Sequence, residues 1–245
     1  MGSAIGKSLQ KAGFKVVVSA PDQKIHDNKK IPGLADVIIL AVRPPVVAQV
    51  AEEIAPLINK KHIVISIATG VPLNFFEKKF PRGTKLARVM PNLPAQVGCG
   101  VSGWISKNLL ATEKKTVRKI LESFGEAVEM KKEDNMNAVT AVSGSGPAYV
   151  FAILESLEKQ AVKMGIRRAD AKLLALMTLA GSVAYAADAV KQNTDFKTLK
   201  NMVKTKGGTT EAAFKVLDKA GWQSTFEKAI VAAYARAREI EKQSS

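Results

Sequence analysis

The sequence contains one cysteine, Cys99, and only two histidines, His26 and His62, among 245 residues. A single cysteine excludes an intrachain disulfide and favours a reducing compartment, so a cytoplasmic protein is expected. So few thiols and imidazoles form no cluster with the spacing of metal ligands, and no metal site is expected. Aromatic residues make up only 6% of the chain, whereas hydrophobic residues make up 47%, enough to build the core of a globular protein.

Acidic residues are also scarce: 22 of them face 37 lysines and arginines, for a formal net charge of +15. Such an excess is typical of a nucleic-acid binder or of a site for an anionic cofactor. The lysines, however, occur as scattered pairs such as Lys29-Lys30 and Lys60-Lys61, with few aromatic residues among them. We interpret them as a solvated basic surface and expect no nucleic-acid partner.

The longest apolar run covers residues 173–187 and is rich in alanine. It is too short to cross a bilayer, which takes about 20 residues. The run predicts a helix that is buried all round, at an interface between subunits, and no contact with a membrane.

The first half of the sequence alternates short apolar runs with helical stretches, the pattern of β-α-β units. Strands are predicted at residues 14–18, 37–42, 63–67, 86–90, 100–106 and 127–130. Helices are predicted near the start, ending at about Ala12, and at residues 46–58, 73–80 and 112–124. After Lys131 the chain continues only in alanine- and leucine-rich helical segments. We therefore expect an α/β protein with a domain boundary near residue 130.

The opening residues, Met1-Gly2-Ser3-Ala4-Ile5-Gly6, are similar to the end of a G-x-G-x-x-G turn with Gly2 as its third glycine. Glycines at such a turn let the backbone approach the pyrophosphate of a dinucleotide at a helix N-terminus. The first strand and the first two glycines of the turn would precede Met1. The segment between Val18 and Asp36 is also shorter than the roughly 30 residues of a full strand-helix-strand module.

Ser19 follows the first predicted strand, where an acidic residue would bind the ribose of NAD. A serine here, with Lys24 nearby, suits a 2′-phosphate and favours NADPH. The alternative is an ordinary turn around Pro21.

Two glycine-rich segments mark the helical half. Ser143-Gly144-Ser145-Gly146-Pro147 lies inside a long helical segment, where glycine and proline cost about 1 and 3 kcal/mol against alanine. Such residues are kept where backbone must closely approach another helix or a ligand. Gly207-Gly208-Thr209-Thr210 opens a later helix with N–H and hydroxyl donors suited to an anion; the alternative is a helix N-cap that uses Thr209 or Thr210.

Residues 138–149 read A-V-T-A-V-S-G-S-G-P-A-Y, and residues 199–210 read L-K-N-M-V-K-T-K-G-G-T-T. Together with Arg88-Val89-Met90-Pro91-Asn92, these strings make the chain resemble the pyrroline-5-carboxylate reductase family over nearly its whole length. The resemblance implies a Rossmann-like parallel-sheet domain at residues 1–130. An all-α domain for substrate binding and dimerisation would follow at residues 131–245.

The resemblance also implies the activity. The family reduces the C=N bond of 1-pyrroline-5-carboxylate to L-proline with NAD(P)H, the last step of proline biosynthesis. Hydride transfer to a protonated cyclic imine needs positioning and a grip on the substrate carboxylate, but no nucleophile or metal. NADPH is the expected cofactor, with NADH as an alternative. A homodimer is expected, and further assembly is left open.

The site residues follow from the same resemblance. Those implied for the substrate are Thr205, Gly207, Gly208, Thr209 and Thr210, with Thr178, Thr205 and Thr210 in catalytic roles. Those implied for the cofactor are Met1, Gly2, Ser19, Ala41, Val42, Arg43, Pro44, Ala68, Thr69, Gly70, Met90, Pro91 and Asn92. For Thr178, a packing role in its helix is the alternative.

Several positions depart from the family pattern. Arg43 replaces a usual lysine, Leu93 replaces a threonine, and Thr205-Lys206 replaces Ser-Pro. These departures and the shortened cofactor unit motivate an alternative: an oligomeric relative with impaired catalysis and weakened cofactor binding.

Overall fold

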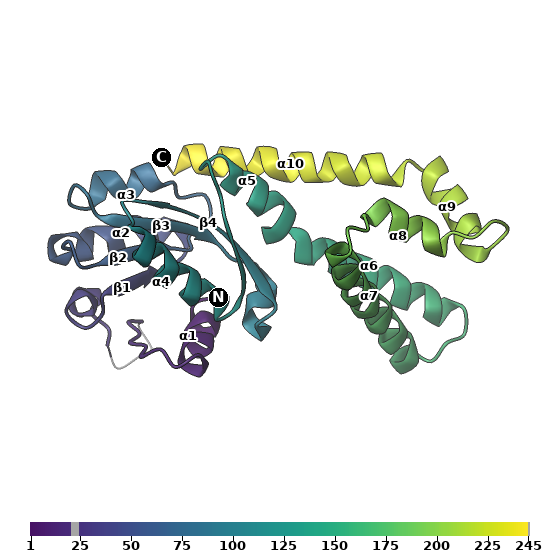
Figure 1. Ribbon diagram of the computed structural model, residues 1–245, viewed down its shortest axis with the longest axis horizontal. Helices are drawn as coiled ribbons and strands as arrows, with labels where there is room; N and C mark the ends of the chain where they lie inside the picture. Colours follow the sequence, from purple (N-terminus) through teal and green to yellow (C-terminus); the bar gives the residue numbers. More distant parts are fainter. Residues whose placement is uncertain (21–24, 245) are drawn as a thin grey trace. The chain divides into compact units, whose positions relative to one another are not determined.

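The structure is a computed structural model that describes residues 1–20 and 25–244, and it separates into two compact units (Figure 1). One unit is discontinuous and contains Met1–Pro147 and Ile230–Ser245; the other contains Ala148–Ala229. The chain therefore passes from one unit to the other twice. The strands end at Glu129, close to the expected boundary at residue 130, but the expected division into two domains at that residue stays a prediction.

A five-stranded mixed sheet forms the centre of the first unit, in the order β1-β2-β3-β4-β5. Its strands are β1 (Val37–Leu40), β2 (Ile63–Ser66), β3 (Lys85–Met90), β4 (Gly100–Lys107) and β5 (Gly125–Glu129). β1, β2 and β3 are parallel to one another, β4 runs antiparallel to β3, and β5 is parallel to β4. Five of the six predicted strands are thus confirmed.

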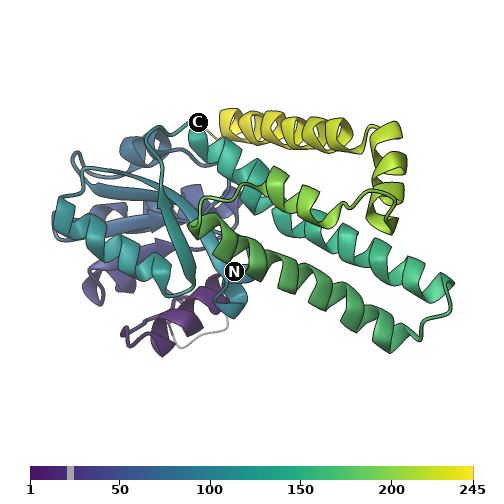
Figure 2. The ribbon, with the colours of Figure 1, turned by 45° about the vertical axis from the view of Figure 1, so that its right-hand side comes forward.

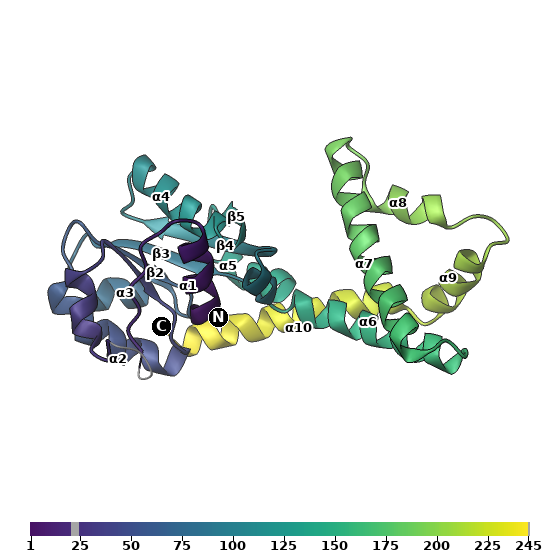
Figure 3. The same cartoon turned by 90° about the horizontal axis from the view of Figure 1, so that it is seen from below.

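Helices cover both faces of the sheet, and residue alternation along the strands decides which face meets which helix. Ile38 and Leu40 belong to the core under α2 (Pro44–Ile54) and α3 (Leu73–Lys79). Ile63 and Ile65 belong to the core under α1 (Gly2–Lys11) and α4 (Ala111–Glu122). Figure 3 shows α2 and α4 on opposite sides of the strands. Three short 3-10 helices connect these elements: η1 (Asn28–Gly33), η2 (Ala55–Leu57) and η3 (Leu93–Val97).

The strand predicted at residues 14–18 is wrong. No strand is assigned there in the described part of the chain, and Val18 is 47% exposed. Among the residues that the structure describes here, one isolated bridge forms, between Ser19 and Ile25. A β-branched run forms a strand only when a neighbouring strand accepts and donates its backbone hydrogen bonds. The edge strand β1 would be that neighbour, but in the described residues it pairs only with β2. Phe14 and Val16 still pack against the core on the α1 face.

The remaining helices continue from the sheet without a linker. They are α5 (Asn135–Val139), a π-helical turn (Thr140–Gly144), α6 (Gly146–Lys163), α7 (Arg168–Lys191), α8 (Phe196–Val203), α9 (Thr209–Lys219) and α10 (Trp222–Gln243). Figure 2 shows α6 and α7 extending to the same side of the turn that joins them, so the chain runs along them in opposite directions. Pro147 falls in the first turn of α6, where its missing N–H has no intrahelical partner to lose.

α7 is longer than predicted. The helix has 24 residues, because charged residues extend the apolar run at both ends, and by length and composition alone it could cross a membrane. Only 11% of its most apolar window is buried within its own chain, so the predicted burial between subunits stays a prediction. Leu173, Met177 and Val183 are each at least 60% exposed. The apolar surface of α7 is thus left uncovered by its own chain.

The start of β5 passes very close to β4. Gly125 has φ +144°, a conformation that side chains rarely adopt. A Cβ placed there would lie 2.0 Å from the carbonyl oxygen of Gly100, its partner in the ladder. The two strands can pair at this point only because position 125 has no side chain.

Candidate functional site

The predicted cofactor residues converge at one edge of the sheet. β1, β2 and β3 are adjacent and parallel, so their carboxyl ends lie side by side, where open α/β sheets bind ligands. The residues that follow these strands are Ala41, Val42, Arg43 and Pro44 after β1, Ala68, Thr69 and Gly70 after β2, and Pro91 and Asn92 after Met90 of β3.

The N-terminus of α1 reaches the same edge. A Cβ on Gly2 would lie 3.0 Å from the Cβ of Ala41, so the helix packs tightly against the end of β1. This is the close approach that the third glycine of a dinucleotide turn permits. The first N–H groups of α1 have no intrahelical partner, which makes this end a suitable place for an anion. The geometry fits the pyrophosphate of a dinucleotide.

The turn after β2 has a shape that requires glycine. Gly70 has φ +77°, in the left-handed region. Before it, the hydroxyl of Thr69 donates to the sulfur of Met90 at 3.7 Å. The turns after β2 and β3 are therefore joined through side chains.

The two family strings of this unit are in contact. The side-chain oxygen of Asn92 accepts from the N–H of Val101 at 3.0 Å, and its amide nitrogen donates to the Ser143 hydroxyl at 3.3 Å. A Cβ on Gly144 would lie 2.6 Å from the terminal methyl of Met90. The space at Gly144 is thus taken by the end of a side chain from β3, and the expected approach of its backbone to another helix or a ligand stays a prediction. A Cβ on Gly146, in contrast, would meet nothing within 4 Å.

Ser19 takes part in a polar network that sequence analysis did not anticipate. Its hydroxyl donates to the Asn28 oxygen at 2.9 Å, and the Asn28 amide donates to Glu53 at 2.8 Å. The hydrogen bond from Asn28, followed by one from Gln49, holds the pKa of the Glu53 carboxyl below its ordinary value. Lys24, predicted to accompany Ser19, lies outside the described residues.

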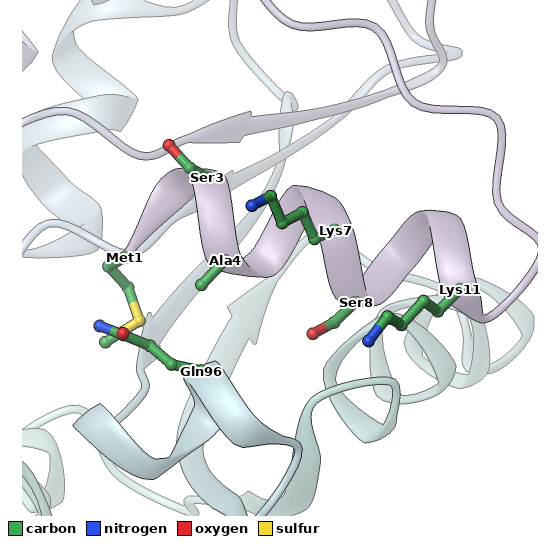
Figure 4. A pocket seen from close by; sticks show the side chains of 7 residues that line it. All are labelled: Met1, Ser3, Ala4, Lys7, Ser8, Lys11 and Gln96. Atoms are coloured by element: carbon green, nitrogen blue, oxygen red, sulfur yellow. The ribbon is translucent and has the colours of Figure 1, made fainter.

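A cavity of about 380 Å³ lies along α1 (Figure 4). It is lined by Met1, Ser3, Ala4, Lys7, Ser8 and Lys11 and by Gln96 of η3. Two lysines at this place give the side of the helix a positive charge. The cavity begins at Met1, next to the edge that holds the other predicted cofactor residues.

The predicted substrate turn belongs to the second unit. Gly207 has φ +76°, and Gly208 is the N-cap residue of α9 without any side-chain capping bond. The N-cap alternative based on Thr209 or Thr210 is therefore wrong, because both residues lie inside the helix. Their N–H groups belong to the first turn, which has no intrahelical acceptors.

Thr205 lies against this turn. Its carbonyl oxygen accepts from the Gly208 N–H at 3.1 Å, and its hydroxyl would lie 2.6 Å from a Cβ at position 208. Glycine at 208 thus makes room for the Thr205 hydroxyl. Thr205 and Gly208 are in contact, and Thr210 lies in the first turn of α9, while Thr178 is exposed on α7. Their roles toward a substrate stay a prediction.

Sequence analysis missed one charged residue of the turn. Glu211, in the first turn of α9, accepts the Gly207 N–H at 2.8 Å. Its signal was readable: an acidic residue three positions after a glycine N-cap can reach back to the preceding backbone. A carboxylate of the protein itself therefore occupies one donor of the predicted anion-binding turn.

Arg88, the first residue of the family string that ends at Asn92, has its side chain buried in a charge cluster. It forms ion pairs with Glu133 and with Glu241 near the end of α10. The burial of Arg88 could have been inferred from the sequence. Every second residue of a strand faces the same side, so Arg88 shares a face with the apolar residues Leu86 and Met90. The described residues contain no group of three or more metal-ligating side chains, and His62 has both ring nitrogens hydrogen-bonded.

The comparisons with known proteins agree on one family. A family model for pyrroline-5-carboxylate reductase dimerisation matches residues 133–240. Pyrroline-5-carboxylate reductase of Methanosarcina acetivorans is 36% identical over 217 residues, 88% of this chain and 79% of the relative. The Synechocystis enzyme of the same name is 38% identical over 218 residues, again 88% of this chain and 79% of the relative.

Solved structures show the same likeness. A Plasmodium falciparum pyrroline carboxylate reductase with NADP bound superposes with a TM-score of 0.87 at 31% identity, covering 98% of this chain and 94% of that one. A Coxiella burnetii pyrroline-5-carboxylate reductase gives 0.88 at 30% identity, with the same coverage of both chains.

Proposed function

The chain belongs to the pyrroline-5-carboxylate reductase family, and we propose how its residues divide the work of that enzyme. The protein is an NAD(P)H-dependent oxidoreductase that reduces 1-pyrroline-5-carboxylate to L-proline. The observation that carries this activity is identity of 36–38% to reductases over 88% of the chain. The alternative of an impaired relative finds no support among these proteins, which all bear the name of the reductase.

The edge formed by the ends of β1, β2 and β3 holds the cofactor. NAD(P)H supplies the hydride when bound. Gly2 brings the N-terminus of α1 to the pyrophosphate, and Ala41–Pro44 and Ala68–Gly70 lie under the dinucleotide. Met90–Asn92 lies beside the nicotinamide ring of the cofactor. The contact of Asn92 with Ser143 supports this assignment, because it joins the cofactor string to the glycine-rich string of the same unit.

The turn from Thr205 to Thr210 holds the substrate carboxylate. Its backbone N–H groups and the Thr205 and Thr210 hydroxyls are donors at the positive end of α9. The role of these residues is to bind and orient the imine, since the protein contributes position rather than a covalent step. Thr178 is proposed as a further hydroxyl near the substrate.

NADPH is the preferred cofactor. In the sequence pattern Ser19 occupies the position of the ribose-binding carboxylate of NAD sites, although the strand expected before it does not form, and its hydroxyl donates to Asn28. The bound NADP of the Plasmodium falciparum relative supports the same preference. With both reduced cofactors assayed on the same preparation, kcat/KM should be higher for NADPH.

The functional unit is a homodimer built on α7. The match to a dimerisation family supports a homo-oligomer, and the uncovered apolar face of α7 supplies the surface that a second copy would bury. A cytoplasmic protein without a membrane or nucleic-acid partner is proposed on other grounds, the single cysteine and the scattered lysine pairs.

The activity is tested directly with the purified full-length protein. NADPH should bind saturably by cofactor fluorescence, and NADPH oxidation should depend on added 1-pyrroline-5-carboxylate. Proline should accumulate in equal amount to the NADPH consumed. Absence of saturable NADPH binding, or binding without imine-dependent oxidation, would remove the proposed function.

Removal of the charge at position 211 should improve substrate binding. The carboxylate of Glu211 competes with the substrate carboxylate for the Gly207 N–H and repels it. We expect Glu211→Gln to lower KM for the imine by about two- to fivefold, the effect of one partly exposed charge. Glu227→Gln, an exposed change on α10 with a hydrogen bond to Gln223, is the matched control. A higher KM in Glu211→Gln would mean that the carboxylate orders the turn instead.

A further inference from the structure

Arg88 carries a positive charge into the interior of the sheet unit. Its side chain is only 4% exposed, and its Nη1 donates to Glu133 Oε1 at 2.9 Å and to Glu241 Oε1. The two carboxylates are 31% and 18% exposed, so the cluster reaches from the interior to the surface. Removal of one partner of a buried ion pair leaves charge without compensation, so such a pair resists separation.

Both carboxylates are themselves fixed by other elements. Glu133 accepts the N–H of Leu73, the first residue of α3, at 2.7 Å. Glu241 accepts from the side-chain amide of Asn137 at 2.7 Å, and Asn137 is 2% exposed. The cluster thus ties β3, α3, α5 and the end of α10 together, all within the first unit (Figure 1).

The end of α10 that the cluster holds lies against the turn after β2. A Cβ on Gly70 would be 2.5 Å from a methyl of Ile240 and 3.5 Å from the backbone nitrogen of Glu241. Gly70 therefore lies directly against the Ile240 side chain and close to the backbone of the last turn of α10. A shift of α10 by a fraction of an ångström would move this turn.

Resting on the proposed function, we propose that Arg88 and Glu241 are positioning residues for the cofactor. Their ion pair seats the last turn of α10 beneath Ala68–Gly70, and this contact fixes the backbone on which the dinucleotide lies. Neither side chain touches the cofactor. Their effect passes through Ile240 and the Gly70 turn, which is why it concerns NADPH and leaves the separate Thr205–Thr210 turn unaffected.

Glu241→Gln tests this role in the full-length enzyme. The amide keeps the size of the side chain but loses the charge. Arg88 and Asn137 donate to different oxygens of Glu241, and in glutamine one of these two acceptors is replaced by an NH2 donor. We expect KM and Kd for NADPH to rise about tenfold, because a small misplacement of a binding surface is costly. KM for 1-pyrroline-5-carboxylate should change less than twofold.

Glu239→Gln is the matched control on the same helix. Glu239 pairs with Arg236 in a contact where both side chains are 61% exposed, and this variant should behave as the wild type. A lower melting temperature of Glu241→Gln with an unchanged KM for NADPH would overturn the positioning role, since that is the result for a purely structural pair. Equal rises in KM for NADPH and for the imine would overturn it as well.

Ile240→Ala provides a second test without any change of charge. It removes the methyl groups that contact Gly70, so KM for NADPH should rise again while the imine KM stays within twofold. If Glu241→Gln is too unstable to assay, an unchanged NADPH KM in Ile240→Ala overturns the inference. An inactive wild-type enzyme would instead contradict the proposed function, so the two failures are distinguishable.

Discussion

Thr210→Val should raise KM for 1-pyrroline-5-carboxylate by about 10- to 100-fold, the loss of one hydrogen bond to a charged group. Valine keeps the branched shape of threonine but cannot donate to a carboxylate. KM for NADPH should change less than twofold, because the predicted cofactor residues belong to the other unit. Steady-state kinetics with each substrate varied in turn measures both constants on one preparation.

Thr116→Val is a suitable control for this substitution. Thr116 is exposed on α4, and its hydroxyl donates only within the helix, to the carbonyl oxygen of Thr112 at 3.3 Å. Kinetics of this variant should match the wild type. Equal increases of both KM values in Thr210→Val would contradict the assignment of Thr210 to the carboxylate.

Gly125→Ala should abolish the folded state of the sheet unit. The added methyl would lie 2.0 Å from the Gly100 carbonyl oxygen and 2.4 Å from its carbon, and backbone in a ladder cannot move aside cheaply. We expect a loss of more than about 4 kcal/mol, comparable with the whole stability of many domains. Soluble yield and thermal unfolding followed by circular dichroism report the effect.

Gly83→Ala is the control that distinguishes the steric clash of an added methyl group from the strain of a positive φ angle. Gly83 has φ +84°, but a Cβ there would meet nothing within 4 Å. Its alanine variant should lose only the strain of the left-handed conformation, about 1–2 kcal/mol, and remain folded. Similar losses in both variants would show that strain alone, and not contact with Gly100, requires glycine at position 125.

Much of the sheet unit could be predicted from the sequence because its elements are short and sharply patterned. Ile63–Ser66 is an apolar run, and its four residues are all buried, as expected for a central parallel strand. Residues 14–18 could not be predicted in this way: the run Val16-Val17-Val18 has the composition of a strand, but a strand forms only where another strand can pair with it. Composition reports a residue's preference, and pairing is a property of the whole sheet.

The parts of the candidate site that consist of neighbouring residues in the sequence could be predicted from it. The turn at Gly207-Gly208 could be recognised because positive φ and an open helix N-terminus are local properties. The partners of Arg88 were not accessible in this way, because Glu133 and Glu241 are brought to it by tertiary packing of α5 and α10. The contact of Met90 with Gly144 likewise joins two strings whose relation the sequence does not encode locally.

The discontinuity of the first unit has a consequence for biosynthesis. A growing chain is released from the ribosome from its N-terminus, so the five strands emerge long before Ile230–Ser245. Until that last segment is free, the guanidinium of Arg88 faces only one of its two carboxylates, and the surface around Gly70 lacks its cover. The nascent sheet is therefore expected to reach its final form only after residues 230–245 have left the ribosome, and chains released before that point would be substrates for chaperones or proteases.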